Sequence, residues 1–216
     1  MLRILFFRLP IRHGSLLRHP SGGRRYAFPP YASCGTCMDQ LQKYQFEQIF
    51  PGCRLLDIHE YLLKKGVKLD GGMPDAPDTR YLYHDPCHMP IKTMPGIKVA
   101  RALMGQRVEL SERCCGEAGT LAAGRPDVAT QVHFRKQEEI ENGVARLRDG
   151  GGVGKAAKVK ALTSCPSCLQ GLSRFTDAGI EADYIVVEMA RRLLGENWLA
   201  DYAEKANAGG IERVLL

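Results

Sequence analysis

The chain has 216 residues, of which 44% are hydrophobic and 25% are charged, as in globular proteins large enough to bury a core. No apolar run approaches the roughly 20 residues that a membrane span requires. The net charge of +6 comes from six arginines within residues 1–38, which hold no acidic residue, and the rest of the chain has 24 basic and 24 acidic side chains. This balance argues against a broad nucleic-acid-binding face.

Residues 1–30 are rich in arginine and proline and contain a Ser-Gly-Gly turn. Their apolar stretch Ile4–Phe7 is too short for the core of a secretory signal. A mitochondrial transit peptide is one interpretation, because such segments are rich in arginine and poor in acidic residues. We favour the alternative, a basic segment that is disordered or non-native, which predicts a cytoplasmic protein rather than one of the mitochondrial matrix.

Two parts of the chain, residues 31–66 and 164–195, follow the same order of features. Each has a Cys-x-x-Cys pair, a helical stretch, an apolar run, and a helix that stops at a glycine. The pairs are Cys34/Cys37 and Cys165/Cys168. We interpret this as an internal duplication. The first copy lacks the further cysteines that precede the second pair, so residues 31–66 are expected to be the remnant of a cysteine-rich repeat.

Residues 67–79 are rich in Gly, Pro and Asp and form the expected linker to residues 80–216, a complete repeat with a helical tail. The elements expected there are strands at Arg80–His84, Arg107–Leu110, Lys158–Thr163 and Tyr184–Val187, and helices at about Met94–Met104, Arg125–Arg148, Glu188–Leu194 and in the tail around Trp198. Because strands alternate with helices, we expect an α/β fold of two duplicated halves with small, mostly parallel sheets, the first half truncated.

Five cysteines form an ordered pattern of Cys, then Cys-Cys-Gly, then Cys-x-x-Cys. They are Cys87, Cys114, Cys115, Cys165 and Cys168. A single tetrahedral zinc rarely takes adjacent cysteines, because both thiolates then leave one short backbone segment. A cluster with several metal corners can use both. Each group of cysteines lies where a predicted strand ends and a helix begins. Binding sites in parallel sheets form at the carboxyl ends of the strands. The free N–H groups at a helix start stabilise the negative charge of thiolates.

These stretches resemble the CCG-type cysteine-rich domains of heterodisulfide reductase catalytic subunits, of iron–sulfur subunits in glycolate and lactate oxidation, and of the C-terminal part of FAD-linked oxidases. The matching residues are His84-Asp85-Pro86-Cys87-His88, Cys114-Cys115-Gly116 and Cys165-Pro166-Ser167-Cys168. The resemblance covers about residues 31–195. It implies that the five cysteines bind a [4Fe–4S] cluster, while Cys34 and Cys37 are weaker candidates as metal ligands.

Three polar residues flank the cysteines: His84, His88 and Arg113. We expect the histidines to tune the cluster through hydrogen bonds rather than to bind metal, and Arg113 to offset its charge. Cys53 is interpreted as a small buried hydrophobic residue. The glycine-rich stretch Gly150–Lys155 does not complete a phosphate-binding loop, because it lacks the leading glycine and the Ser or Thr after the lysine.

The resemblance implies an iron–sulfur electron-transfer module, which is part of an oxidoreductase rather than a complete enzyme. The partners it implies are a flavin-containing dehydrogenase subunit or domain, which would carry FAD and oxidise a 2-hydroxy acid such as lactate or glycolate, and a ferredoxin-type iron–sulfur subunit. Peripheral membrane association is compatible with this interpretation. Two alternatives stay open: thiol–disulfide redox catalysis at the cluster, as in heterodisulfide reduction, and a zinc-stapled structural domain without redox activity.

Overall fold

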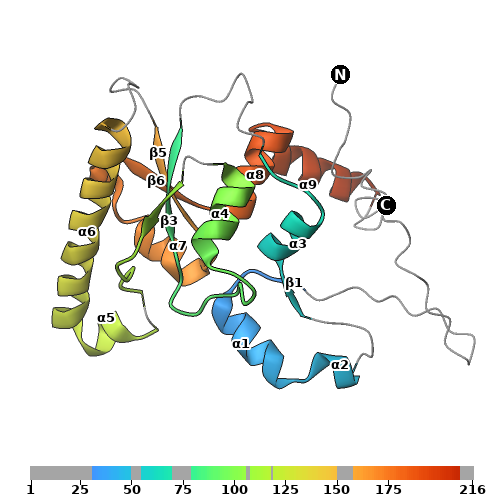
Figure 1. Ribbon diagram of the computed structural model, residues 1–216, viewed down its shortest axis with the longest axis horizontal. Helices are drawn as coiled ribbons and strands as arrows, with labels where there is room; N and C mark the ends of the chain where they lie inside the picture. The colour runs from blue at the N-terminus through green and yellow to red at the C-terminus, as the bar shows by residue number, and fades with distance from the viewer. Residues whose placement is uncertain are drawn as a thin grey trace, which may run out of the picture.

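The computed structural model describes residues 31–49, 55–69, 79–105, 108–117, 119–149 and 158–209 (Figure 1). The basic segment 1–30, Cys53, most of the linker and the glycine-rich loop 150–154 lie outside these ranges. The strands are β1 (Tyr31–Ala32), β2 (Leu56–Asp57), β3 (Arg80–His84), β4 (Val108–Ser111), β5 (Val159–Thr163) and β6 (Ile180–Tyr184). The helices are α1 (Gly35–Lys43), α2 (Phe46–Ile49), α3 (Ile58–Lys64), α4 (Gly96–Met104), α5 (Leu121–Gly124), α6 (Pro126–Asp149), α7 (Pro166–Leu172), η1 (Thr176–Ala178), α8 (Ile185–Leu194) and α9 (Trp198–Gly209).

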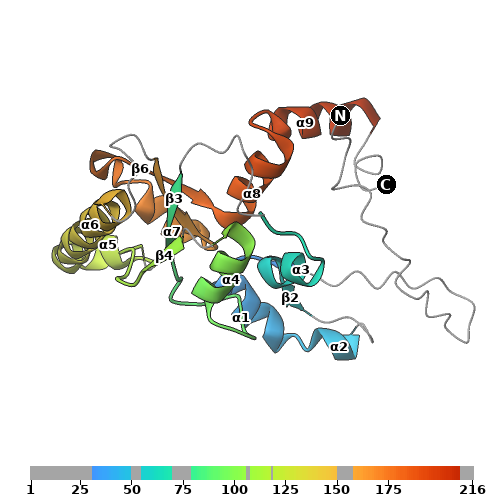
Figure 2. The same ribbon diagram turned by 45° about the horizontal axis from the view of Figure 1, so that its top comes forward.

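The main sheet has the strand order β4-β3-β5-β6, and every neighbouring pair in it is parallel. A second, two-stranded parallel sheet joins β1 to β2. Helices cover both faces of the main sheet, with α6 and α4 on opposite sides (Figure 2). The α/β fold with small parallel sheets is therefore confirmed.

The alternation of side chains along β3 divides the core between the two faces. Tyr81 and Tyr83 pack with α4 and α8 on one face, whereas Leu82 packs with α6 and α7 on the other. All three side chains are buried. A strand covered on both faces reads as a continuous apolar run, which is why the Tyr-Leu-Tyr sequence indicated a strand.

The two cysteine pairs lie in matching surroundings, as the duplication predicts. Cys34 follows β1 and Cys165 follows β5. Each has an extended backbone and occupies the N-cap position of the helix that carries the second cysteine of its pair. In both copies the next strand runs parallel to the first and leads without a loop into another helix, β2 into α3 and β6 into α8. The order of elements is thus the same in both copies.

Two expected elements were placed wrongly. The apolar run Tyr184–Val187 is not a strand, because β6 ends at Tyr184 and α8 already begins at Ile185. Ile185 of this run is apolar because it is buried in the core against the main sheet, as is Met189 one helical turn later. The helical stretch expected after Cys37 is interrupted at Gln45, whose φ of 50° lies in the left-handed region.

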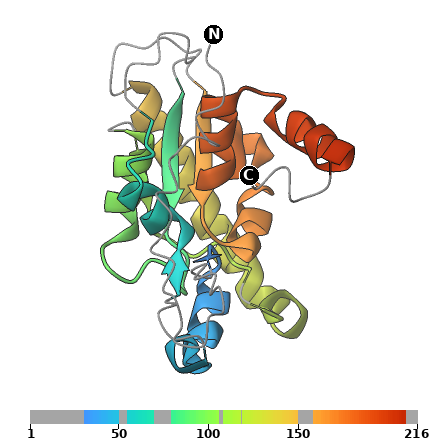
Figure 3. The ribbon, with the colours of Figure 1, turned by 90° about the vertical axis from the view of Figure 1, so that its right-hand side faces the viewer.

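The C-terminal helix α9 extends away from the main sheet beyond α8 (Figure 3). Its side chains Leu199 and Tyr202 are exposed. Among the helices that the structure describes, none combines the length and the apolar character needed to cross a membrane.

Candidate metal centre

The register of the main sheet brings three strand ends to one edge. His84, at the end of β3, pairs with Ser111 of β4 and with Thr163 of β5. Within four residues of each of these positions the chain reaches a cysteine. Three segments that are distant in sequence therefore bring their five cysteines to the same edge of the sheet.

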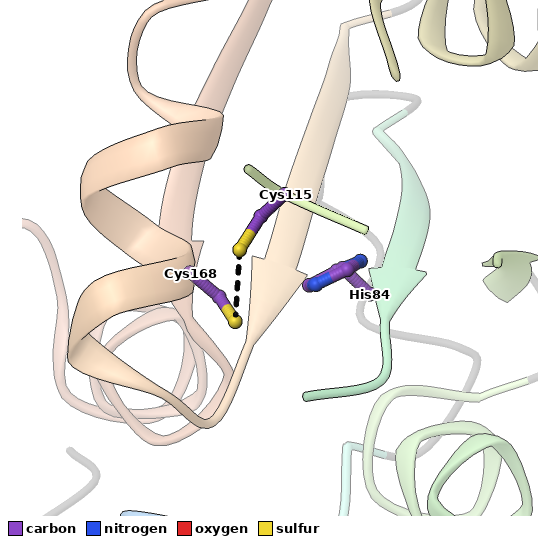
Figure 4. A group of neighbouring side chains, drawn as sticks. All are labelled: His84, Cys115 and Cys168. Carbon is purple, nitrogen blue, oxygen red and sulfur yellow. Dashed lines mark hydrogen bonds between the residues drawn. The ribbon is translucent and has the colours of Figure 1, made fainter. Parts of the chain in front are cut away.

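Cys115 and Cys168 form the buried part of this site, with their sulfur atoms 3.4 Å apart (Figure 4). The imidazole of His84 projects from β3 toward the two sulfurs, and the potential ligand atoms of the three residues lie within 4.8 Å of one another. All three side chains are buried. This is the one buried group of metal-binding side chains found among the described residues.

The glycines of the site permit the close approach of its loops. Gly116 has a φ of 82°, a conformation that side chains disfavour, and its N–H lies 3.4 Å from the sulfur of Cys114. On α7, a β-carbon added at Gly171 would lie 2.8 Å from the carbonyl oxygen of Cys115. The Cys-Cys-Gly loop can therefore pack directly on the backbone of α7 only because residue 171 is glycine.

The remaining three cysteines surround the buried pair. Cys87 and Cys114 are exposed, and Cys165 is half-buried. Partial burial raises the pKa of Cys87, and the nearby sulfurs of Cys114 and Cys115 raise it further. Cys165 lies close enough to Cys168 to contribute to the raised pKa of that thiol. The five cysteines are therefore neighbours in space as well as members of one motif.

Within the buried pair, Cys115 and Cys168 have pKa values that shift in opposite directions. A hydrogen bond from Cys168 lowers the pKa of Cys115 to about 4, and His84 and the backbone N–H of Glu117 add to this effect against the opposing effect of burial. The same hydrogen bond, together with burial, raises the pKa of Cys168. Cys115 is thus held as a thiolate, the form in which cysteine binds metal.

The first cysteine pair lies against the same site. A β-carbon added at Gly35 would overlap the carbonyl oxygen of His88, so α1 packs directly on the loop after Cys87. A hydrogen bond with Cys34 raises the pKa of Cys37, and the nearby Cys165 adds to the shift. Cys34 is half-buried and Cys37 is exposed, so this pair lies at the rim of the site.

The flanking polar residues differ in what they contact. His84 faces the buried sulfurs, but Nδ1 of His88 lies 2.8 Å from a carboxylate oxygen of Asp39 on α1. The guanidinium of Arg113 donates to Glu138 and to the carbonyl oxygen of Arg135 on α6. His88 and Arg113 therefore hold α1 and α6 to the cysteine-bearing loops.

Lys136 of α6 is a site residue that the motif did not indicate. Its side chain is buried, and its ammonium lies 2.6 Å from Ser111 Oγ, 2.8 Å from Glu139 Oε2 and 3.2 Å from His84 Nδ1. Burial lowers the pKa of Lys136, whereas Glu139 and the sulfurs of Cys115 and Cys114 act in the opposite direction. A buried cation thus stands beside the cysteines.

Glu139 connects this lysine to the Cys-Cys-Gly loop. Its carboxylate accepts hydrogen bonds from the backbone N–H groups of Glu112 and Arg113. A signal for Lys136 was present in the sequence. Lys136 stands at the regular four-residue step between the apolar positions Val132 and Ile140, where an apolar residue is expected.

Comparison with known proteins finds one family model and several curated relatives. A family model described as a domain of unknown function (DUF3400) matches residues 173–216. An uncharacterized iron–sulfur protein of Methanococcus maripaludis is 30% identical over 116 residues, which cover 50% of this chain and 22% of that protein. A subunit of the dihydromethanophenazine:CoB–CoM heterodisulfide reductase of Methanosarcina acetivorans is 29% identical over 132 residues, 54% of this chain and 28% of the relative.

A third relative is a subunit of the fumarate reductase (CoM/CoB) of Methanothermobacter marburgensis, 29% identical over 114 residues, 50% of this chain and 22% of the relative. The matched region thus covers between a fifth and a third of these relatives. No solved structure matches the chain. The relatives confirm what the cysteine pattern indicated: this chain is similar to the CCG-type cysteine-rich domains found in heterodisulfide reductases.

Proposed function

We propose that the chain is an iron–sulfur electron-transfer module whose cluster is bound by Cys87, Cys114, Cys115, Cys165 and Cys168. The observation that carries the proposal is the placement of five neighbouring thiols at one sheet edge, two of them buried and in contact. Tetrahedral zinc uses four ligands and seldom two adjacent cysteines, whereas iron–sulfur clusters are held by several thiolates.

The chemistry of the donor set fits such a cluster. Cys115 is held as a thiolate, and Cys165 caps the N-terminus of α7, where free N–H groups stabilise negative charge. The buried cation of Lys136 offsets part of the charge of several thiolates. A [4Fe–4S] cluster held here would supply one-electron transfer. The chain itself orients the sulfurs, keeps water from the buried pair and donates hydrogen bonds to it.

The relatives support a role within a larger redox complex. Their names describe an iron–sulfur protein and subunits of heterodisulfide and fumarate reductases. We therefore propose that this chain exchanges electrons with a flavin-containing subunit or domain and with a ferredoxin-type iron–sulfur subunit. As the source of electrons we propose the oxidation of a 2-hydroxy acid such as lactate or glycolate.

A second candidate function is the reduction of a disulfide at the cluster itself. It is favoured by the relatives named as heterodisulfide reductase subunits and by the exposure of Cys87 and Cys114, which a disulfide substrate could reach. A change in the spectrum of the reduced cluster on addition of an organic disulfide would support this function over simple electron transfer.

The proposal is tested by purifying the full chain without oxygen and measuring iron, zinc and acid-labile sulfide. We expect iron and sulfide in equal amounts, with a brown colour that bleaches on reduction. A colourless protein that contains one zinc and no sulfide would contradict the proposal and would favour a structural zinc domain.

A further inference from the structure

The ammonium of Lys136 has three acceptors and three protons to donate. Ser111, Glu139 and His84 each lie within hydrogen-bond distance of Nζ. A lysine ammonium donates only, so the His84 nitrogen that faces it must be the acceptor. The carboxylate of Glu139, at 2.8 Å, stabilises the charged form of the lysine.

This contact decides which nitrogen of the His84 ring carries the proton. In a neutral imidazole one nitrogen donates and the other accepts. Nδ1 accepts from Lys136, so the proton is on Nε2. Nε2 is buried and has no hydrogen-bond partner by ordinary geometric criteria among the described protein groups. The ring that bears it projects toward the sulfurs of Cys115 and Cys168 (Figure 4).

We propose that Lys136 is a positioning residue that fixes His84 as an N–H donor toward the sulfur of Cys115 and thereby prevents His84 from binding metal. A ring nitrogen that carries a proton has no lone pair to give to a metal. The site therefore has a purely thiolate ligand set, with the histidine as a hydrogen-bond donor outside it.

The proposal has a consequence for the bound cluster, and this part rests on the proposed function. Hydrogen bonds to sulfur and nearby positive charge both favour the reduced, more negative state. Lys136 supplies the charge directly and the hydrogen bond through His84. Loss of the lysine should therefore make the reduction potential of the cluster more negative without removing the cluster.

The first experiment needs no cluster. In metal-free full-length protein labelled with 15N-histidine, long-range 1H–15N spectra at pH about 8, above the ordinary histidine pKa of about 6.5, report the tautomer of each ring. The signal of His84 is identified by its loss in His84→Gln. We expect the proton on Nε2 in the wild type and a substantial population on Nδ1 in Lys136→Met. A wild-type ring with its proton on Nδ1 would overturn the proposal.

The second experiment measures the potential of the reconstituted cluster in Lys136→Met. The matched control is Lys158→Met, which removes an exposed lysine paired with Glu181 at the opposite end of β5. We expect a more negative potential in the first variant and an unchanged potential in the control. Equal potentials in the two variants, or a directly bound 15N nitrogen in pulsed EPR spectra of the wild type, would overturn the proposal.

Lys136→Met leaves the carboxylate of Glu139, which is 16% exposed, without its partner. The double variant Lys136→Met/Glu139→Gln removes this unpaired charge and replaces the single variant in the tautomer experiment if the latter does not fold. Failure of the wild type to assemble any cluster would refute the proposed function, and the tautomer measurement would still decide the role of Lys136.

Discussion

Replacing Gly171 by alanine tests whether the Cys-Cys-Gly loop must pack on the backbone of α7. The added β-carbon would lie 2.7 Å from Cγ of Glu117 and 2.8 Å from the carbonyl oxygen of Cys115. The side chain of Glu117 can move aside, but the Cys115 oxygen belongs to the backbone of the loop. The loop must therefore shift away from α7, and Cys115 moves with it.

The size of the effect follows from two opposing contributions. Overpacking of a close contact costs about 1–3 kcal/mol, whereas alanine stabilises a helix relative to glycine by about 0.5–1 kcal/mol. We therefore expect a net loss of up to about 2 kcal/mol in the free energy of unfolding. Since the shift displaces one of the five sulfurs, we also expect a clear loss of iron and sulfide per chain.

Gly124→Ala is the matched control, because a β-carbon at this helical position meets no atom within 4 Å. Urea unfolding and iron analysis after anaerobic reconstitution should show an unchanged or slightly more stable control and a weakened Gly171→Ala variant. Wild-type stability and wild-type iron content in Gly171→Ala would refute the packing argument.

Three further predictions concern other parts of the fold. Cys115→Ser should lose its acid-labile sulfide whereas Cys53→Ser should keep it, and equal retention in both would count against the ligand assignment. Gly35→Ala should lower the thermal unfolding temperature, because its β-carbon would overlap the carbonyl oxygen of His88; a temperature equal to that of the wild type would show that α1 is not packed there. Glu188 is buried, but ion pairs and hydrogen bonds outweigh this burial and hold its pKa below the usual range, so Glu188→Gln should destabilise the protein by about 3–5 kcal/mol at neutral pH. Its contribution is present above the unfolded carboxyl pKa of about 4.3 and is lost as the pH falls through the folded value; a difference between variant and wild type in urea unfolding that stays constant down to pH about 2 would contradict this account.

The strands that lead to the cysteines could be predicted closely from sequence because local signals agree there. β3 was expected at Arg80–His84 and is found there, since an apolar run ends at the Asp85-Pro86 turn. β6 was missed although its sequence, Ile-Glu-Ala-Asp-Tyr, alternates in the manner of a strand with one exposed face. The more apolar run that follows it belongs to the buried first turn of α8, and a short apolar run does not distinguish a strand from a helix.

The site could be predicted only in part, because local patterns do not specify contacts between distant elements. The cysteine motif is local, and the parallel sheet places its three segments at one edge, so their proximity follows from sequence and topology together. The contact of Lys136 with His84 depends on where α6 crosses the sheet, which no local pattern specifies. A polar residue within the apolar stripe of α6 marks the position but not its partner.

One cluster held by thiolates from three strand ends would be seen directly by native mass spectrometry of the anaerobically purified full chain. We expect a mass that exceeds the polypeptide by one [4Fe–4S] unit and a return to the bare chain mass in Cys115→Ser. A wild-type mass that fits one zinc ion, or the polypeptide alone, would contradict it.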